Sequence, residues 1–308
     1  MSLAFVFPGQ GSQSIGMLAE LAAAHPIVTE TFAQASAVLG YDLWEVVQQG
    51  PADKLNQTAA TQPAMLAAGV ATWRVWQSQS DIKPELMAGH SLGEYTALVC
   101  AGVIAFEDAI KLVAERGRLM QEAVPEGEGA MAAILGLDDD VVIDTCDRAA
   151  LGEVVSAVNF NSPGQVVIAG KKAAVERAVE IAKDEGAKRA LLLPVSVPSH
   201  CSLMEPAAEK LLAQMAAITF NTPQIPVINN VDVKAENDPE AIRNALARQL
   251  YMPVRWVESV EAMAADGVDR IIECGPGKVL AGLNKRIVKS MAAQPVFDPA
   301  TLEKALAE

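Results

Sequence analysis

Short apolar runs alternate along the chain with longer segments in which apolar residues recur about every 3.6 positions. The short runs predict strands at residues 3–7, 86–89, 227–231 and 270–274. The periodic segments predict helices at residues 62–79, 92–101, 106–123, 239–250 and 278–289. Strands and helices that alternate in this way are typical of an α/β protein with a parallel sheet.

One region follows a different order. It reads strand (130–135), helix (139–150), two strands (154–160 and 165–169), helix (171–186) and a final strand, with turn-forming residues at 161–164. This β-α-β-β-α-β order predicts a ferredoxin-like small domain at 126–196, inserted into a large α/β-hydrolase-like catalytic domain made of 1–125 and 197–308. The stretches 125–129 and 194–198 are the predicted hinges, and we expect an active site between the domains.

Composition and charge narrow the class of protein. The 308 residues are 51% hydrophobic and 20% charged, the balance of a packed globular protein. The formal charge of −14 disfavours nonspecific binding to nucleic acid or to an anionic membrane. The longest apolar stretch, 96–106, is too short for a membrane helix, which needs about 18 residues or more.

The N-terminus and the cysteines bear on location. The first apolar run is ended by Pro8 and Gly9, so we expect no signal peptide. The four cysteines are widely scattered, without the spacing of a zinc site or a disulfide framework. A cytoplasmic location and the absence of a metal are therefore predicted.

A glycine-rich pentapeptide, Gly89-His90-Ser91-Leu92-Gly93, joins a predicted strand to a predicted helix. A G-x-S-x-G pattern in this context is typical of a nucleophile elbow, in which the serine hydroxyl projects from a sharp turn. The amide of Leu92, at the start of the helix, would then point toward an oxyanion. Ser91 is the predicted nucleophile, and a serine that only caps the helix is the alternative.

A serine nucleophile needs a base, and the chain has three histidines. His25 precedes Pro26 near an expected helix end, which indicates a surface or capping residue. His90 neighbours Ser91, but adjacent side chains on a tight turn point in different directions, so we expect it to pack beneath the turn. His200 lies in a proline-stiffened loop after the predicted insert and can reach the elbow. It is the predicted base, with a buried structural histidine as the alternative.

No Asp or Glu stands out as the third group that would orient the imidazole. Gln249, near the end of a predicted helix, can offer a carbonyl oxygen instead, although a solvated glutamine fits the spacing nearly as well. The glycine loop at 8–13 follows the first strand and allows the backbone to approach a ligand closely. It lacks the lysine of a Walker loop.

Several motifs occur in order over nearly the whole chain: FPGQGSQ at 7–13, Gln62-Pro63, GHSLGE at 89–94, ERGRLMQ at 115–121, NFNSPGQVVIAG at 159–170, VPSH at 197–200 and ECGPGKVL at 273–280. Together they resemble the malonyl-CoA:acyl-carrier-protein transacylase family of bacterial type II fatty acid synthesis. The resemblance implies that Ser91 is the acylated nucleophile and His200 its base, with Gln249 offering a carbonyl oxygen to the histidine. It also implies that the amides of Gln10 and Leu92 form the oxyanion hole.

For the substrate, the resemblance implies that Arg116 binds the free malonyl carboxylate. A planar guanidinium can bind a carboxylate with two parallel hydrogen bonds, which suits this task. From the sequence alone, Arg116 also fits a solvated helix face beside Glu115 and Arg118. Gln62 and Asn161 fall on positions that line or brace the site.

The resemblance implies transfer of malonyl from coenzyme A to the phosphopantetheine thiol of an acyl carrier protein, in a ping-pong sequence through a Ser91 ester. No metal or tightly bound cofactor is expected. Three alternatives stay open: a serine esterase or thioesterase, a non-catalytic carrier-binding scaffold, and a trans-acting acyltransferase of a polyketide pathway.

The expected carrier protein is small and acidic, and an enzyme of charge −14 would repel it at long range. Docking therefore predicts a local basic patch near the mouth of the site. The candidates are Lys188, Arg189, Lys285, Arg286 and Lys289. Ordinary solvated charges are the alternative.

Overall fold

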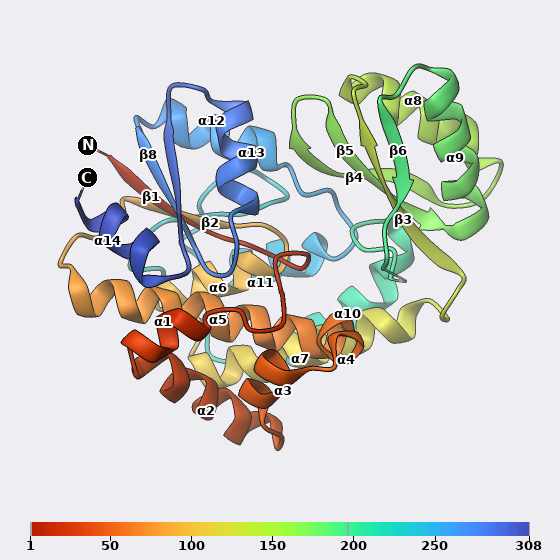
Figure 1. Cartoon of the computed structure of the whole chain (residues 1–308). Helices are drawn as coiled ribbons and strands as arrows, with labels where there is room; N and C mark the ends of the chain where they lie inside the picture. Colours follow the sequence, from red (N-terminus) through yellow and green to blue (C-terminus); the bar gives the residue numbers. More distant parts are fainter. Residues whose placement is uncertain (1, 196, 308) are drawn as a thin grey trace.

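The computed structural model describes residues 2–195 and 197–307, which form a larger and a smaller domain (Figure 1). The larger domain contains a five-stranded sheet in the order β7-β2-β1-β8-β9, with every pair parallel. Its strands are β1 (Leu3–Phe7), β2 (Leu86–Gly89), β7 (Val227–Ile228), β8 (Arg270–Cys274) and β9 (Ala292–Val296). Segments from both ends of the chain thus lie side by side in this sheet, because β1 pairs with β8 and β8 pairs with β9.

Helices cover both faces of this sheet. They are α1 (Ala19–Ala24), α2 (Ile27–Leu39), α3 (Leu43–Gln49), α4 (Ala52–Asn56), α5 (Thr58–Gln79), α6 (Leu92–Cys100), α7 (Phe106–Ala123), α10 (Glu205–Met215), α11 (Pro239–Gln249), α12 (Trp256–Ala265), α13 (Val279–Ile287) and α14 (Pro299–Ala307). A short 3-10 helix, Ser202–Met204, precedes α10. None of the described helices combines the length and apolarity needed to cross a membrane.

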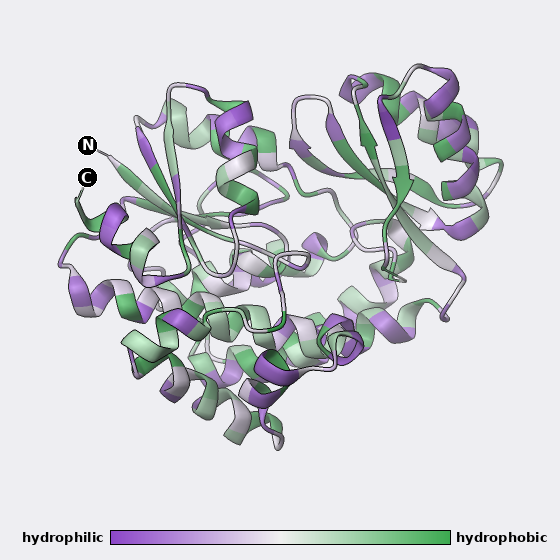
Figure 2. Ribbon diagram, viewed as in Figure 1, coloured by the Kyte–Doolittle hydropathy of each residue, from purple (hydrophilic) through white to green (hydrophobic). Residues whose placement is uncertain are grey.

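Strand β1 shows why both faces are buried. Its odd residues, Leu3, Phe5 and Phe7, pack into the core that α5, α6 and α7 share, whereas Ala4 and Val6 face the core under α12 and α13. Successive side chains of a strand point to opposite faces, so a strand covered on both sides is apolar throughout. In Figure 2 the central strands and α5 are accordingly largely green.

The smaller domain has its own sheet and core. Its elements are β3 (Gly129–Leu135), α8 (Asp139–Ala150), β4 (Val155–Ser162), β5 (Gln165–Lys171), α9 (Lys172–Asp184) and β6 (Arg189–Leu192). The antiparallel sheet has the order β4-β5-β3-β6, and a separate apolar core lies beneath α8 and α9. This is the ferredoxin-like arrangement, so the predicted fold class is confirmed. The second predicted hinge includes Ser196, which lies outside the described residues.

The small sheet presents its other face to the larger domain. In β3, Ala130, Ala132 and Ile134 pack under the helices, whereas Met131 and Ala133 line a cavity between the domains. The period-two alternation of a strand produces this division. The small domain therefore supplies one wall of the site.

Several predicted boundaries are wrong. Strand β7 ends at Ile228 instead of residue 231, because Asn229 turns the chain by bonding the carbonyl of Lys234. Helix α5 begins at Thr58, before the predicted start at 62, and contains Pro63. Strand β4 extends to Ser162, which places Asn161 on a strand instead of in the turn.

The C-terminal region also differs from its prediction. Helix α13 ends at Ile287, so Lys289 lies beyond it, and β9 and α14 follow without having been predicted. Strand β9 contains Pro295, which argues against a strand in a sequence pattern. The proline is tolerated because β9 is an edge strand that pairs only with β8.

Candidate active site

Ser91 lies on the sharp turn between β2 and α6, with φ 52° and ψ −110°. The turn requires its two flanking glycines. A Cβ on Gly89 would lie 1.8 Å from the carbonyl carbon of Gly93, and a Cβ on Gly93 would lie 2.0 Å from the oxygen of Phe7. The geometry is that of a nucleophile elbow, with the hydroxyl directed into the cavity.

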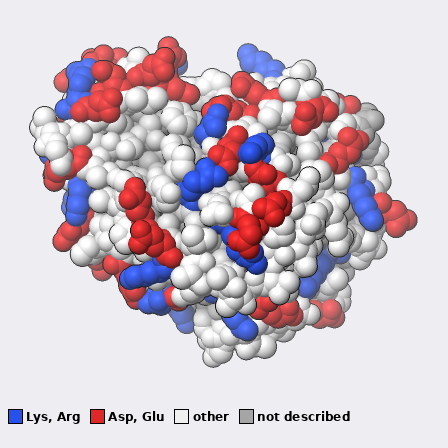
Figure 3. Space-filling view, turned by 180° about the vertical axis from the view of Figure 1, so that it is seen from behind, with Lys and Arg blue, Asp and Glu red and all other residues white. Residues whose placement is uncertain are grey.

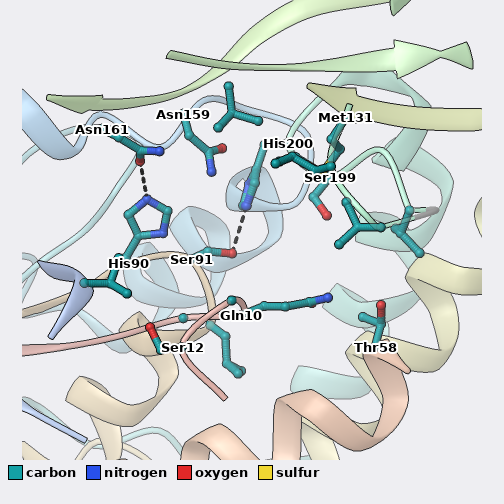
Figure 4. Close-up of a pocket in the computed structure, with 18 of the residues that line it drawn as sticks. Gln10, Ser12, Thr58, His90, Ser91, Met131, Asn159, Asn161, Ser199 and His200 are labelled. Carbon is teal, nitrogen blue, oxygen red and sulfur yellow. Dashed lines mark hydrogen bonds between the residues drawn. The ribbon is translucent and has the colours of Figure 1, made fainter. Parts of the chain in front are cut away.

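His200 follows the second predicted hinge and reaches the elbow. Its Nε2 lies 2.8 Å from Ser91 Oγ (Figure 4). Its Nδ1 lies 2.6 Å from the backbone oxygen of Gln249. A carbonyl oxygen only accepts, so Nδ1 carries the proton and donates. The Nε2 lone pair is therefore directed at the Ser91 hydroxyl, as a general base requires.

The charge state of His200 follows from its surroundings. Burial, together with the positive charge of Arg116, lowers the pKa of His200 to about 3, although the bond to the Gln249 oxygen acts in the opposite direction. The imidazole is thus neutral at neutral pH. It is able to accept a proton from Ser91 without first losing one.

Arg116 projects from α7 into the interior and is 1% exposed. Its Nη2 donates to Gln249 Oε1 at 3.1 Å and approaches Ser91 Oγ at 3.3 Å. Both of these acceptors are uncharged, and Nε has no hydrogen-bond partner among the described residues. The guanidinium stacks over the Tyr95 ring at 5.3 Å. A buried cation with such partners has capacity for an incoming carboxylate.

Arg118, two residues after Arg116, lies on the exposed face of α7. Arg118 bonds Glu115 and Glu122 there. The solvated position that the sequence left open for Arg116 is therefore wrong, because a one-residue step on a helix turns a side chain by about 100°.

Gln249 is fully buried, so the solvated alternative for this residue is also wrong. Its backbone oxygen bonds His200, and its carboxamide bonds three other groups. Nε2 donates to the Ser91 backbone oxygen at 3.0 Å and to Glu94 Oε2 at 2.8 Å, while Oε1 accepts from Arg116. One residue thus contacts Ser91, His200 and Arg116.

The sequence reasoning missed Glu94 and Asn230. Asn230 accepts from the Ser91 amide at 2.7 Å and donates to the Gly89 oxygen at 2.7 Å, so its side chain holds both ends of the elbow. Its own amide donates to Glu94 Oε2 at 2.9 Å. Burial raises the pKa of Glu94 to about 7, against the lowering effect of the hydrogen bonds from Gln249 and Asn230. Glu94 ends the GHSLGE motif, which is the one sequence signal for its position.

The loop after β1 lies against the elbow. The amide of His90 donates to the oxygen of Phe7 at 3.0 Å, and a Cβ on Gly9 would lie 2.4 Å from the oxygen of His90. Gln10 and Leu92 both line the cavity. Their backbone N–H groups have no acceptor within the part of the chain that the structure describes, which is the condition that an oxyanion hole requires.

His90, Asn161 and Gln62 surround the reacting groups. His90 Nε2 lies 2.7 Å from Asn161 Oδ1, and its ring packs against Trp256 at 5.6 Å, so it is directed away from Ser91 (Figure 4). Burial lowers the pKa of His90. Gln62 is buried with Nε2 near Met120 Sδ at 3.5 Å, and its Oε1 has no partner among the described residues.

The cavity has a volume of about 570 Å³ and lies between the two domains. Ser91, His200 and Arg116 line one part of it. Apolar side chains from both domains line much of the rest, including Met131, Val167, Leu193, Val195 and Leu283. A chain with a polar end and an apolar stem fits such a lining.

The chain places a serine on an elbow of a parallel sheet, across a cavity from a ferredoxin-like insert. This combination is that of an acyltransferase class of α/β protein. The family model described as "Acyl transferase domain" matches residues 4–302. The chain is 65% identical over 305 residues to the malonyl CoA-acyl carrier protein transacylase of Salmonella typhimurium, covering 99% of each chain. The chain belongs to the malonyl CoA-acyl carrier protein transacylase family.

Solved structures agree with this membership. A crystal structure of an acyl carrier protein S-malonyltransferase from Vibrio cholerae has a TM-score of 0.97 and 64% identity, over 99% of this chain and 100% of that one. A malonyl-transacylase solved in complex with its holo type II PKS acyl-carrier protein has a TM-score of 0.99 and 62% identity, over 100% of this chain and 99% of that one.

Proposed function

We propose that this chain transfers the malonyl group of malonyl-CoA to the phosphopantetheine thiol of an acyl carrier protein through an ester on Ser91. One observation carries the proposal: Ser91 Oγ contacts both a neutral imidazole, His200 Nε2, and a buried guanidinium, Arg116 Nη2. The first partner activates a nucleophile, and the second recognises an acyl group that ends in a carboxylate. The names of the relatives support the same substrate pair.

In the first half-reaction, Ser91 Oγ attacks the thioester carbonyl while His200 Nε2 takes its proton. The amides of Gln10 and Leu92 stabilise the oxyanion of the tetrahedral intermediate. The C–S bond then breaks, the coenzyme A thiolate takes the proton from His200, and a malonyl ester stays on Ser91. The Gln249 oxygen stabilises the transient imidazolium through Nδ1.

In the second half-reaction, the thiol of the carrier protein occupies the place of coenzyme A. His200 takes its proton, and the thiolate attacks the Ser91 ester. Collapse of the second tetrahedral intermediate returns the proton to Ser91 Oγ and releases the malonyl thioester of the carrier protein. The same groups act in both directions, which gives a ping-pong sequence.

We propose fatty acid synthesis as the pathway that receives this product. A trans-acting role in a polyketide pathway is the second candidate, and the similarity to a malonyl-transacylase solved with a type II PKS carrier protein favours it. An esterase would use the same elbow, but a buried arginine beside the serine has no purpose in hydrolysis of uncharged esters. The cytoplasmic location stays a prediction.

We expect Arg116→Ala to lower acylation by malonyl-CoA far more than acylation by acetyl-CoA. Removing one partner of a buried ion pair costs about 3–5 kcal/mol, or roughly a hundredfold or more in rate. Single-turnover acylation with each donor measures the ratio. Arg118→Ala on the exposed face of α7 is the matched control and should change neither rate. An equal loss with both donors would show that Arg116 does not recognise the carboxylate.

We also propose that the carrier protein docks on basic side chains at the mouth of the cavity. Lys188 and Arg189 precede the lining residues Leu193 to Val195, and Lys285 and Arg286 follow the lining residue Leu283 on α13. In Figure 1, α13 faces the side of the small domain that carries β4 and β5, and β6 lies beyond them.

The five candidate side chains for docking are Lys188, Arg189, Lys285, Arg286 and Lys289. None of them takes part in an ion pair among residues 2–195 and 197–307. On the face in Figure 3, blue and red side chains are interspersed. Unpaired cations are available to an acidic partner.

The charge reversal Lys285→Glu/Arg286→Glu should raise the KM for the carrier protein several-fold, because rim charges mainly affect association. Acylation by malonyl-CoA should change little. Lys83→Glu/Lys304→Glu, at exposed positions outside the cavity, is the control of equal charge. The two half-reactions are measured separately at low and high salt. Equal impairment of both, or of neither, would rule out the patch.

A further inference from the structure

The Glu94 carboxylate is buried three residues after Ser91 and contacts none of the reacting groups. It lies in the first turn of α6 and is 2% exposed. Its Oε2 accepts two hydrogen bonds, from Gln249 Nε2 at 2.8 Å and from the Asn230 amide at 2.9 Å. A buried carboxyl group is costly unless it is bonded, so these two donors account for its stability there. Glu94 takes part in neither half-reaction.

The bond to Gln249 has a directional consequence. A carboxamide has a donor end and an acceptor end. With Nε2 held by Glu94 and by the Ser91 oxygen, Oε1 is turned toward Arg116 Nη2. The reverse orientation would set an NH2 group against the N–H groups of Arg116 and an oxygen against Glu94. An acceptor at position 94, together with the Ser91 oxygen, therefore favours the orientation in which the arginine meets Oε1.

We propose that Glu94 is a positioning residue for malonyl recognition: by holding Gln249 Nε2 it directs Gln249 Oε1 to Arg116 and so fixes the guanidinium beside Ser91 Oγ. The inference rests on the proposed function, since it assigns Arg116 to the malonyl carboxylate. The required property is an acceptor oxygen, not a charge. A carboxyl group protonated on Oε1 still accepts at Oε2, as does the single oxygen of a glutamine.

Two substitutions separate these properties. Glu94→Gln keeps an oxygen able to accept from Gln249 and from Asn230, and it should leave acylation by malonyl-CoA and acetyl-CoA close to wild type. Glu94→Ala removes the acceptor and should lower the malonyl-to-acetyl ratio of kcat/KM about tenfold, the effect of a lost hydrogen bond to a charged group. A ratio that falls in Glu94→Gln, or stays at the wild-type value in Glu94→Ala, overturns the proposal. General damage to the fold would lower both rates without changing their ratio.

Gln249→Ala tests the same link from its other end, and it decides the matter if Glu94→Ala does not fold. It retains the backbone oxygen that bonds His200. We expect the malonyl-to-acetyl ratio to fall as in Glu94→Ala. The double variant should show no further fall, because both changes break the same chain of hydrogen bonds from Glu94 through Gln249 to Arg116. An unchanged ratio in Gln249→Ala overturns the inference. A wild-type protein that forms no malonyl adduct would instead contradict the proposed function, so the two failures are distinguishable.

Discussion

Ser91→Ala should form no malonyl adduct and should transfer no malonyl to a carrier protein. The alanine has no oxygen to take up the acyl group, and no other serine or cysteine contacts His200 Nε2 among the described residues. Loss of a serine nucleophile in a protease costs on the order of 10⁶-fold in kcat, and we expect a loss of that order. Single-turnover transfer with labelled malonyl-CoA measures it.

The fold should tolerate this change, because Ser91 Oγ bonds only His200 and Arg116 among residues 2–195 and 197–307. Ser78→Ala, on the exposed end of α5, is the control for serine replacement and should behave as wild type. Substantial turnover by a folded Ser91→Ala protein would mean that malonyl passes directly between thiols. The ping-pong sequence would then be wrong.

The second large effect is expected of His200→Ala, which should slow acylation of Ser91 by about 10²–10⁴-fold, the usual contribution of a general base. His25→Ala replaces a histidine outside the cavity and is the matched control. Thermal unfolding of both variants checks that the loss is chemical. A fall of less than a few-fold in folded His200→Ala would remove His200 from the mechanism.

The pH dependence of the wild-type enzyme belongs to the same prediction. The pKa of His200 lies near 3, well below the ordinary 6.5, so the base is neutral above pH 3 and becomes protonated only below it. The acylation rate should therefore show no decline with a midpoint near pH 6.5 as the pH falls toward 5. Titration of the rate at that midpoint would show that His200 is charged more easily than its burial indicates.

The same shift affects stability. The unfolded chain protonates His200 near pH 6.5, whereas the folded chain resists this. Below pH 6.5 the unfolded state thus binds more protons, and the contribution of His200 to stability falls as the pH is lowered toward 3.

Much of the fold could be predicted because its signals are local. The strands at 3–7, 86–89 and 270–274 and the helix at 106–123 have the predicted bounds, since each is a continuous apolar run or a regular 3.6-residue pattern between turn formers. Strand β9 could not be predicted, because its proline is acceptable only at a sheet edge. Whether a strand lies at the edge or in the centre of a sheet depends on the whole sheet and not on the local sequence.

The residues of the site likewise differ in whether a local sequence signal identifies them. Ser91 carries a local motif, and His200 could be found because the chain has few histidines. Glu94 and Asn230 could not be assigned, because their importance consists of hydrogen bonds between residues 136 or more positions apart. Likewise, the burial of a charged residue such as Arg116 could not be assigned from its position on α7 alone, because it depends on how α7 packs against α5 and α10.

The central claim is that malonyl becomes an ester of Ser91. The most direct test is intact mass spectrometry of the wild-type protein after brief incubation with malonyl-CoA, with peptide mapping of the adduct and a second measurement after a holo carrier protein is added. The account predicts one malonyl group per chain, located on Ser91, which disappears as malonyl-carrier protein forms. An adduct on another residue, or one that the carrier protein does not discharge, would contradict it.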